Sequence, residues 1–212
     1  MEDAETAREL ARAREGDQSA IGELLEAHRA RLERLVILRF DRRLRGRVDP
    51  ADVVQDTFLE ATQRLARYLD SPDMPFFLWL RFLAIQRLQG LCREHLGVQK
   101  RDIRREIPIA EAMYTEASSE ALAARLLGSF TTPSQAAMRA EMKARLTAAL
   151  DSMDPEDREI IALRHFEELS HSEAARVIGM DESAASKRYL RAIKRLKSIL
   201  DREHGVSEPP WA

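Results

Sequence analysis

The sequence lacks the residues on which most enzyme centres and disulfide scaffolds depend. It contains one cysteine, Cys92, in 212 residues, which excludes an intrachain disulfide framework and a zinc cluster with the usual cysteine spacing. No two histidines have His-x-x-x-His spacing, and there is neither a glycine-rich phosphate loop nor a Gly-x-Ser-x-Gly turn. We therefore expect no metal, no cofactor and no catalytic residues, and a protein that is not an enzyme.

Long hydrophobic runs are also missing. The longest apolar stretch, Phe76 to Leu80, ends at Arg81 and is far shorter than the roughly 20 residues that span a bilayer. The first residues, Met1-Glu2-Asp3, are acidic and lack the basic and apolar layout of a signal peptide. We therefore expect a cytoplasmic protein without membrane insertion.

The net charge of −2 hides an uneven distribution along the chain. Seven basic residues and two acids lie between residues 81 and 105, and six basic residues and no acid lie between residues 187 and 197. The segment between these blocks is acidic, with Glu106, Glu111, Glu116 and Glu120. Two basic blocks separated by an acidic segment indicate two contacts with a polyanion.

The spacing of apolar residues predicts an all-α protein of two small helical domains joined by a flexible linker. Residues 17–96 show helical spacing, and Asp49-Pro50 marks one helix start, because aspartate is a favoured N-cap and proline a favoured first residue. The segment 103–137 is rich in serine and threonine and weakly periodic, which predicts a linker. The predicted boundaries are 1–102 for the first domain, 103–137 for the linker, 138–202 for the second domain and 203–212 for a tail.

A helix-turn-helix motif is predicted in the second domain. Ser170 and Glu173 have the spacing of a capping box, Gly179 stands where a helix end needs a left-handed residue, and Asp181 can cap the next helix. One face of that next helix is polar and basic, with Ser183, Ser186, Lys187, Arg188, Arg191, Lys194 and Arg195. This layout is typical of a reader of duplex DNA. The alternative is a solvated surface, but cations without interspersed acids repel one another.

The order of these motifs resembles that of RNA polymerase sigma factors of the extracytoplasmic-function (ECF) type, over about residues 18–102 and 140–200. The segment Asp49-Pro-Ala-Asp-Val-Val-Gln-Asp-Thr-Phe-Leu-Glu-Ala resembles the polymerase-binding helix of the family. Trp79-Leu80 with Leu83-Ala84 resembles its promoter-melting helix, and residues 150–200 resemble its region that reads the −35 element. The chain departs from the family at Ile85-Gln86, where Arg-Asn is frequent, and at Gly90, where Asp is frequent.

The resemblance implies a sigma-70 family alternative sigma factor, with a region 2 helical bundle and a region 4 helix-turn-helix domain. The first domain binds core RNA polymerase and captures unpaired bases of the −10 element, and the second reads the −35 element. The expected partners are core RNA polymerase, through its largest-subunit clamp and its flap, promoter DNA and, as one form of control, an anti-sigma factor. Such a protein is expected to be nucleoid-associated.

The polymerase-binding residues that the resemblance implies are Asp49, Asp52, Gln55, Asp56 and Glu60. Three of these acids, Asp52, Asp56 and Glu60, have i, i+4, i+8 spacing. Each like-charge pair at this spacing destabilises an isolated helix by about 0.2–0.5 kcal/mol. Such a stripe of charge fits a basic partner surface; an ordinary solvated face is the alternative.

The residues implied for the −10 element are Arg81, Gln86, Arg87, Arg93, Lys100 and Arg101. We expect Arg81, Gln86 and the loop from Asp70 to Pro75 to be exposed and to capture flipped bases, and the remaining cations to hold phosphates. The aromatic rings of Phe76, Phe77 and Trp79 could stack on bases, but we expect Trp79 to be mainly packed in the core.

Two other functions fit part of the sequence. A helix-turn-helix regulator would bind duplex DNA as a dimer without core polymerase. An enzyme acting on nucleic acid would need a carboxylate or metal constellation, which the sequence does not show. The acidic stripe and the second basic block favour the sigma factor over both.

Overall fold

The structure, a computed structural model, describes residues 2–97, 122 and 135–203, and these residues form helices without a strand. The chain divides into two compact units, Met1–Ala110 and Glu111–Ala212. The predicted all-α class with two helical units is therefore confirmed. The expected linker lies outside the described residues except for Leu122 and residues 135–137, which already belong to a helix. The exact domain boundaries stay predictions.

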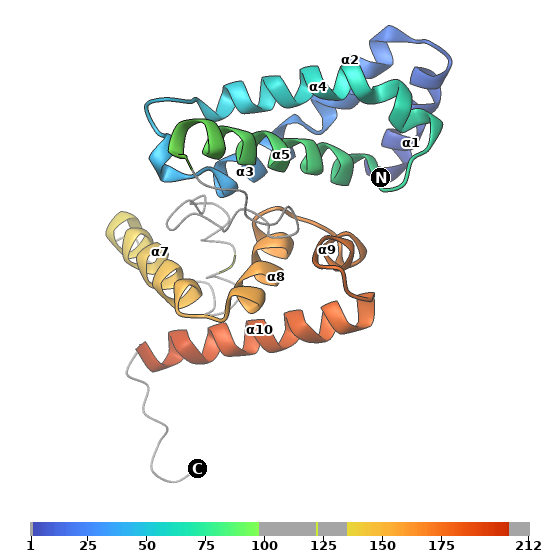
Figure 1. Cartoon of the computed structure of the whole chain (residues 1–212). Coiled ribbons are helices and arrows are strands. Elements are labelled where there is room, and N and C mark those ends of the chain that lie inside the picture. The colour runs from blue at the N-terminus through green and yellow to red at the C-terminus, as the bar shows by residue number, and fades with distance from the viewer. Residues whose placement is uncertain (1, 98–121, 123–134, 204–212) are drawn as a thin grey trace. The chain divides into compact units, whose positions relative to one another are not determined.

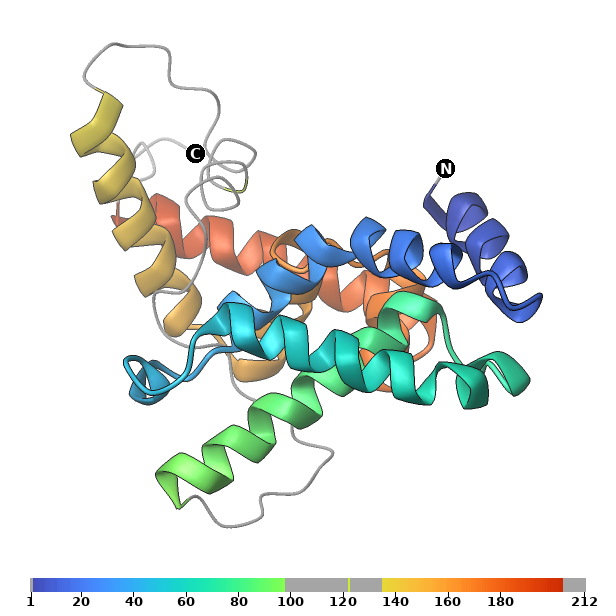
Figure 2. The same cartoon turned by 90° about the horizontal axis from the view of Figure 1, so that it is seen from above.

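Unit 1 contains, in its described part, the helices α1 (Glu2–Arg14), α2 (Gln18–Ala27), α3 (Arg29–Arg39), α4 (Pro50–Asp70) and α5 (Phe76–Leu96), with a 3-10 turn η1 (Arg42–Leu44) (Figure 1). Helix α5 packs against both α3 and α4, and α1 packs against α2. Figure 2 shows α5 crossing α4 at an angle. The core of this unit therefore lies around α5.

Local sequence signals explain most of the helix boundaries in unit 1. Helix α4 begins as predicted, because the side chain of Asp49 accepts a hydrogen bond from the amide of Ala51 at 2.9 Å and Pro50 is the first residue. The helical stretch between Gln18 and Arg39 is interrupted at His28, which separates α2 from α3. His28 is only 2% exposed and lies in the core of unit 1.

Helix α1 is not predicted by apolar spacing, because its sequence is mostly charged residues and alanine. Its position depends on Arg12, whose guanidinium donates to the carboxylates of Glu9 at 2.6 Å, Asp17 at 2.6 Å and Glu23 at 2.8 Å. The pairs with Asp17 and Glu23 join α1 to the turn that follows it and to α2. The sequence signal for α1 is therefore electrostatic rather than hydrophobic.

Unit 2 contains, in its described part, α7 (Gln135–Asp151), α8 (Pro155–His165), α9 (His171–Ile178) and α10 (Glu182–Glu203). Helix α10 packs against α7, α8 and α9 (Figure 1). Its inward side chains are the ones that helical spacing predicts, Ala185, Tyr189, Ala192, Leu196 and Leu200, and all of them are buried. No helix in the described part of the chain has the length and apolar content to cross a bilayer.

Asp17 provides a test of the ion pairs that Arg12 makes between α1 and α2. Its carboxylate caps α2 through the amides of Ser19 and Ala20. The pKa of Asp17 is lowered from 3.8 to about 2, most strongly by the hydrogen bond from the Ser19 hydroxyl and next by the hydrogen bond from Arg12. Since the folded pKa lies below the unfolded value, the unfolded chain binds more protons in this range, and this stabilisation is lost as the pH falls towards 2.

We therefore expect Asp17→Asn, which keeps a capping side chain without the charge, to lower the Tm above about pH 5. The gap in Tm between the parent and this variant should shrink as the pH approaches 2. Thermal unfolding followed by circular dichroism across this pH range measures the gap, with Glu5→Gln on the exposed side of α1 as the control. A gap that stays constant down to pH 2 would contradict the assignment.

Candidate nucleic-acid interface and partner surface

Helices α9 and α10 and the turn between them form the predicted helix-turn-helix. In the capping box of α9, the Ser170 hydroxyl accepts from the amide of Glu173 at 3.1 Å, and the Glu173 carboxylate accepts from the amide of Ser170 at 2.7 Å. The helix ends at Gly179, which has a left-handed φ of +68°. Asp181 then accepts a hydrogen bond from the amide of Ala184 at 2.8 Å. Each predicted cap is confirmed.

Tyr189 fixes the rotation of α10 about its own axis. Its hydroxyl lies 2.9 Å from Nε2 of His165 at the end of α8. The imidazole of His171 meets the tyrosine ring edge-on, with centroids 5.7 Å apart, and the guanidinium of Arg164 lies 5.9 Å from the ring centroid. Contacts from both α8 and α9 therefore determine which face of α10 is open to solvent.

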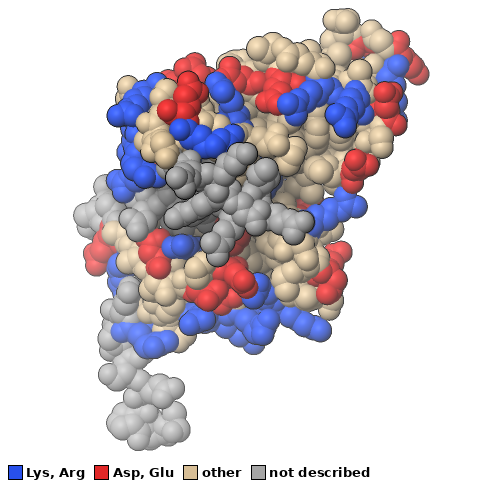
Figure 3. Space-filling view, viewed as in Figure 1, with Lys and Arg blue, Asp and Glu red and all other residues tan. Residues whose placement is uncertain are grey.

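The open face of α10 is basic. Lys and Arg side chains gather along this helix in Figure 3. Of the predicted DNA-binding residues, Ser183, Lys187, Arg191, Lys194 and Arg195 are exposed, and Ser186 and Arg188 are half-buried. The sequence reasoning missed Leu190, which is 57% exposed. Its spacing from Lys187 and Lys194 already places it on this face.

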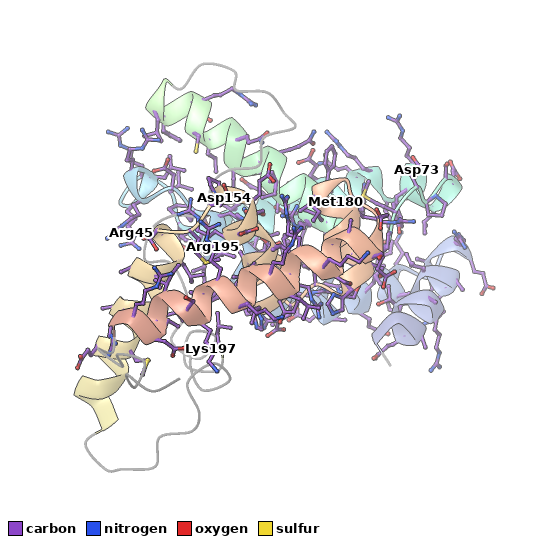
Figure 4. The ribbon with its side chains drawn as sticks, turned by 90° about the horizontal axis from the view of Figure 1, so that it is seen from below. Arg45, Asp73, Asp154, Met180, Arg195 and Lys197 are labelled. Carbon is purple, nitrogen blue, oxygen red and sulfur yellow. The ribbon has the colours of Figure 1, made fainter. Side chains whose placement is uncertain are left out.

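Two of the predicted cations, Arg188 and Arg195, lie toward α8 and form ion pairs there. Arg188 contacts Glu156 at 2.5 Å, and Arg195 lies 3.6 Å from Asp157. In Figure 4, Arg195 projects on the side of α10 where Asp154, the N-cap of α8, lies, and Lys197 projects on the other side. The basic face therefore contains both paired and solvent-facing cations.

Helix α5 is buried around most of its circumference. The buried residues are Phe76, Phe77, Leu78, Leu80, Arg81, Leu83, Ala84, Ile85, Leu88 and Leu91. Arg81 is only 5% exposed, so the expectation that it is open to DNA is wrong. The reason is its position four residues after Phe77 and four before Ile85, on a side of α5 that packing covers.

One narrow stripe of α5 remains open. Trp79, Phe82, Gln86, Gln89 and Arg93 follow one another at intervals of three and four residues and so share a face. Phe82, which the sequence reasoning missed, is 42% exposed. Gln86 is half-buried and Arg93 is exposed, whereas the other predicted cations, Lys100 and Arg101, lie outside the described residues.

Trp79 belongs mainly to an aromatic cluster, as expected. Its ring stacks on Tyr68 with centroids 4.6 Å apart and lies 5.6 Å from the ring of Phe76. The Tyr68 hydroxyl donates to the Met74 carbonyl oxygen at 2.9 Å, and burial raises the pKa of Tyr68, which keeps this donor protonated. The cluster therefore ties the loop before α5 to α4.

The acidic stripe of α4 is largely compensated within unit 1. Arg87 of α5 donates to Asp56 through Nε at 2.9 Å and lies within 2.8 Å of it through its terminal nitrogen. Glu60 pairs with Arg64 at 2.7 Å. Two of the three acids of the predicted stripe, Asp56 and Glu60, are thus paired with arginines of unit 1, and Arg87 is engaged by a carboxylate.

The open face of α4 is centred on Leu59, which is 61% exposed and was missed by the sequence reasoning. Asp52, Gln55 and Gln63 are exposed on the same face. The carboxylate of Asp49, by contrast, is used as the helix cap. An apolar side chain surrounded by an acid and two amides is a surface suited to a protein partner.

Metal chemistry finds no support in the described ranges, where no group of three or more His, Cys, Asp or Glu side chains comes together. Cys92 is half-buried, and burial raises its pKa. A raised pKa disfavours the thiolate, which is the form that binds metals and attacks electrophiles.

Comparisons with known proteins agree with this geometry. The family model Sigma-70, region 4 matches residues 143–196, which include all of α8 and α9. The RNA polymerase sigma factor CnrH of Cupriavidus metallidurans is 31% identical over 194 residues, 90% of this chain and 92% of CnrH. The ECF RNA polymerase sigma factor SigD of Mycobacterium tuberculosis is 29% identical over 188 residues, 89% of this chain and 80% of SigD. The structure of CnrH in complex with the cytosolic domain of CnrY covers 95% of this chain and 98% of that chain, with a TM-score of 0.52 and 25% identity.

The helix-turn-helix with a basic open face defines a helical DNA-binding protein of the transcription machinery. More narrowly, the chain belongs to the RNA polymerase sigma factors, of the ECF type. The resemblance to this family that the motifs indicated is thereby confirmed. The sigma factor is therefore favoured over the alternative of a dimeric helix-turn-helix regulator.

Gly179 provides a test of the turn. Its φ of +68° is unfavourable for any residue with a Cβ, although the structure leaves space for one. We expect Gly179→Ala to destabilise unit 2 by about 1–2 kcal/mol. The matched control is Gly22→Ala, in the middle of α2 and with equal space, which should stabilise unit 1 by about 0.5–1 kcal/mol. Hydrogen exchange of the amides of α9, α10 and α2 measures both, and a neutral Gly179→Ala would contradict the left-handed turn.

Proposed function

We propose that this chain acts in the cytoplasm, on the nucleoid, as an alternative sigma factor that binds core RNA polymerase, recognises promoter DNA and so directs initiation. It performs no catalysis itself. The observation that carries the proposal is the helix-turn-helix of unit 2 with its solvent-facing cations. The proposal is tested as a whole by run-off transcription with purified core polymerase on a library of promoters, where the chain should add initiation at specific sites.

Helix α10 reads the −35 element in this proposal. Ser183 and Ser186 lie near its N-terminal end, the part of such a helix that enters the major groove. Lys187, Arg191 and Lys194 hold phosphates and determine the register on the duplex. Leu190 offers an apolar contact of the kind that reads the thymine methyl group.

Helix α4 binds core polymerase in this proposal, through the face around Leu59. A central apolar anchor within a polar rim is the arrangement that carries most of the binding energy at protein interfaces. Asp52, Gln55 and the Asp56–Arg87 pair form that rim. The largest-subunit clamp is the proposed contact for unit 1 and the flap for unit 2, and the acid of Asp52 fits a basic partner surface.

The polymerase surface is tested with a single charge reversal. Asp52 is exposed and has no ion-pair partner within residues 2–97, 122 and 135–203, so Asp52→Lys should leave folding intact. We expect it to weaken binding to core polymerase by at least about tenfold, because like charges across an interface cost several kcal/mol. The matched control is Glu5→Lys, the same charge change on exposed α1. Equal affinity of both variants, measured by fluorescence anisotropy with core polymerase, would refute the assignment of this face.

The open stripe of α5 captures unpaired bases of the −10 element in this proposal. A base removed from the stack can lie on an aromatic ring, and glutamine amides can bond its edge. Phe82 supplies the exposed ring, with Gln86 and Gln89 on the same stripe. Arg93 adds a cation for the backbone, and no acid lies on the stripe.

We expect Phe82→Ala to leave binding to core polymerase and to closed duplex promoter intact. It should reduce open-complex formation by about 5- to 150-fold, since base stacking on an aromatic ring contributes about 1–3 kcal/mol. Phe82→Tyr, which keeps the ring, should restore opening. Permanganate reactivity of promoter thymines measures the change, and unaltered reactivity in Phe82→Ala would exclude Phe82 from base capture.

An anti-sigma factor is a further proposed partner. The support is the likeness to CnrH, whose structure was determined in complex with the cytosolic domain of CnrY. The exposed leucines of α4 and α10 offer apolar positions for such a regulator. Binding of a regulator to either helix would cover a surface that initiation requires.

A further inference from the structure

Four charged residues lie where α8 and α10 face each other, and we call them the α8–α10 network: Glu156 and Asp157 of α8, and Arg188 and Arg195 of α10. The Arg188 guanidinium lies 2.5 Å from a Glu156 carboxylate oxygen and 3.9 Å from an Asp157 oxygen. Arg195 lies 3.6 Å from the other Asp157 oxygen. Asp157 therefore sits between two guanidinium groups that are seven residues apart on α10.

Burial distinguishes the two acids of the network. The Asp157 side chain is 19% exposed, and the Glu156 side chain is 68% exposed. Both belong to the first turn of α8, where the helix dipole stabilises negative charge. Asp157 is therefore the less exposed of the two acids and faces both arginines, although the Arg195 side chain is itself 57% exposed. Glu156 makes an outer contact that water and salt can reach.

The solvent-facing cations of α10 have a different environment. Lys187, Arg191 and Lys194 are exposed, and within the described parts of the chain they have no ion-pair partner. Helical spacing places Lys187 and Lys194 opposite the buried stripe of Ala185, Ala192 and Leu196. The cations predicted from the sequence as one basic surface are thus of two kinds.

We propose that Glu156 and Asp157 are positioning residues that hold Arg188 and Arg195 away from DNA. They thereby leave the phosphate contacts of the predicted DNA-binding residues to Lys187, Arg191 and Lys194. In the network the carboxylates occupy the place that phosphates would take. This inference rests on the proposed function of α10 as the DNA-reading helix.

The network also explains how α10 tolerates its basic block. Six cations between residues 187 and 197 without an acid repel one another along one helix. The acids that offset them come from α8, and they neutralise the flank of α10 rather than its open face. Moving Arg188 to a phosphate would leave Glu156 facing the same polyanion, so the network opposes that exchange.

The salt dependence of DNA binding tests the proposal. The full chain and its variants are titrated onto a labelled short duplex of random sequence between about 50 and 200 mM salt, and the slope of log K against log salt is measured by anisotropy. Glu156→Gln with Asp157→Asn keeps the shape of both side chains and removes their charge. We expect tighter binding and a slope steeper by about 0.9 for each arginine that gains a phosphate.

A matched control separates this release from a general loss of negative charge. Glu182→Gln with Asp201→Asn removes the same charge from two exposed acids of α10 that the structure shows in no ion pair with an arginine of the described segments. This control should not steepen the slope. In a chain that also has Arg188→Gln and Arg195→Gln, neutralising Glu156 and Asp157 should not steepen it either, because no guanidinium is left to release.

Three results would overturn the proposal. In the first, the Glu156→Gln, Asp157→Asn variant has the same slope of log K against log salt as the parent. In the second, the Glu182→Gln, Asp201→Asn control steepens this slope as much as the Glu156→Gln, Asp157→Asn variant does. Alternatively, Arg188→Gln with Arg195→Gln in the parent could lower the slope by about 0.9 per arginine, which would mean that both already contact phosphates.

Failure of the proposed function gives a different result. Suppose that Lys187, Arg191 and Lys194 are all replaced by alanine and the salt dependence of binding does not become shallower. Helix α10 is then not the DNA surface, and the proposed function fails together with this inference. Suppose instead that the salt dependence becomes shallower in that variant but the Glu156→Gln, Asp157→Asn variant behaves like the parent. The assignment of α10 as the DNA surface then stands, and only the positioning role of Glu156 and Asp157 is refuted.

Discussion

The burial of α5 is the constraint on which the arrangement of unit 1 depends. Ten of the sixteen residues from Phe76 to Leu91 on this helix are buried, and α3 and α4 both pack against it. Burial on this scale leaves one open stripe, and it also covers Arg81, a cation that a count of charges would assign to DNA. The same packing brings Arg87 of α5 into an ion pair with Asp56 of α4. The two surfaces proposed for unit 1 are therefore connected by this ion pair. A substitution in one surface is expected to alter the other.

In unit 2, burial covers a smaller part of the central helix. Helix α10 buries a single stripe against α7, α8 and α9, and the hydroxyl of Tyr189 sets the rotation of the helix through His165. The opposite face is consequently free to carry cations, and Leu190 lies exposed among them. A helix held by one stripe can present a wide surface to DNA, whereas the deeply buried α5 can present only a narrow one. This difference suits the proposed reading of an intact duplex by α10 and the proposed capture of single bases by α5.

Ion pairs decide how many of the charges in this sigma factor are available to partners. The sequence shows a stripe of acids on α4 and a block of cations on α10, but Arg64 and Arg87 neutralise two of the acids, and Glu156 and Asp157 engage two of the cations. Pairs at the surface contribute little to stability, typically less than about 1 kcal/mol. The larger effect that we propose for them is to orient long side chains and so to restrict which of them reach DNA or polymerase. Charges that face solvent, such as Asp52 and Lys187, are the ones left for binding.

The sequence by itself determined the helical class, the start of α4 at Asp49-Pro50, the capping box of Ser170 and Glu173, the left-handed turn at Gly179 and the inward stripe of α10. These features follow from interactions between residues a few positions apart, which a sequence displays directly. The sequence also determined the family, because the order of the motifs is specific. Glu60 with Arg64 was equally readable, since the two residues are one turn apart. Only the tertiary structure decided that Arg81 is buried, that Arg87 and Arg188 are paired, and that Leu59 and Phe82 are exposed. The physical reason is that burial and ion pairing at these positions depend on side chains supplied by other helices, and the spacing within one helix cannot tell which of its sides a neighbour will cover.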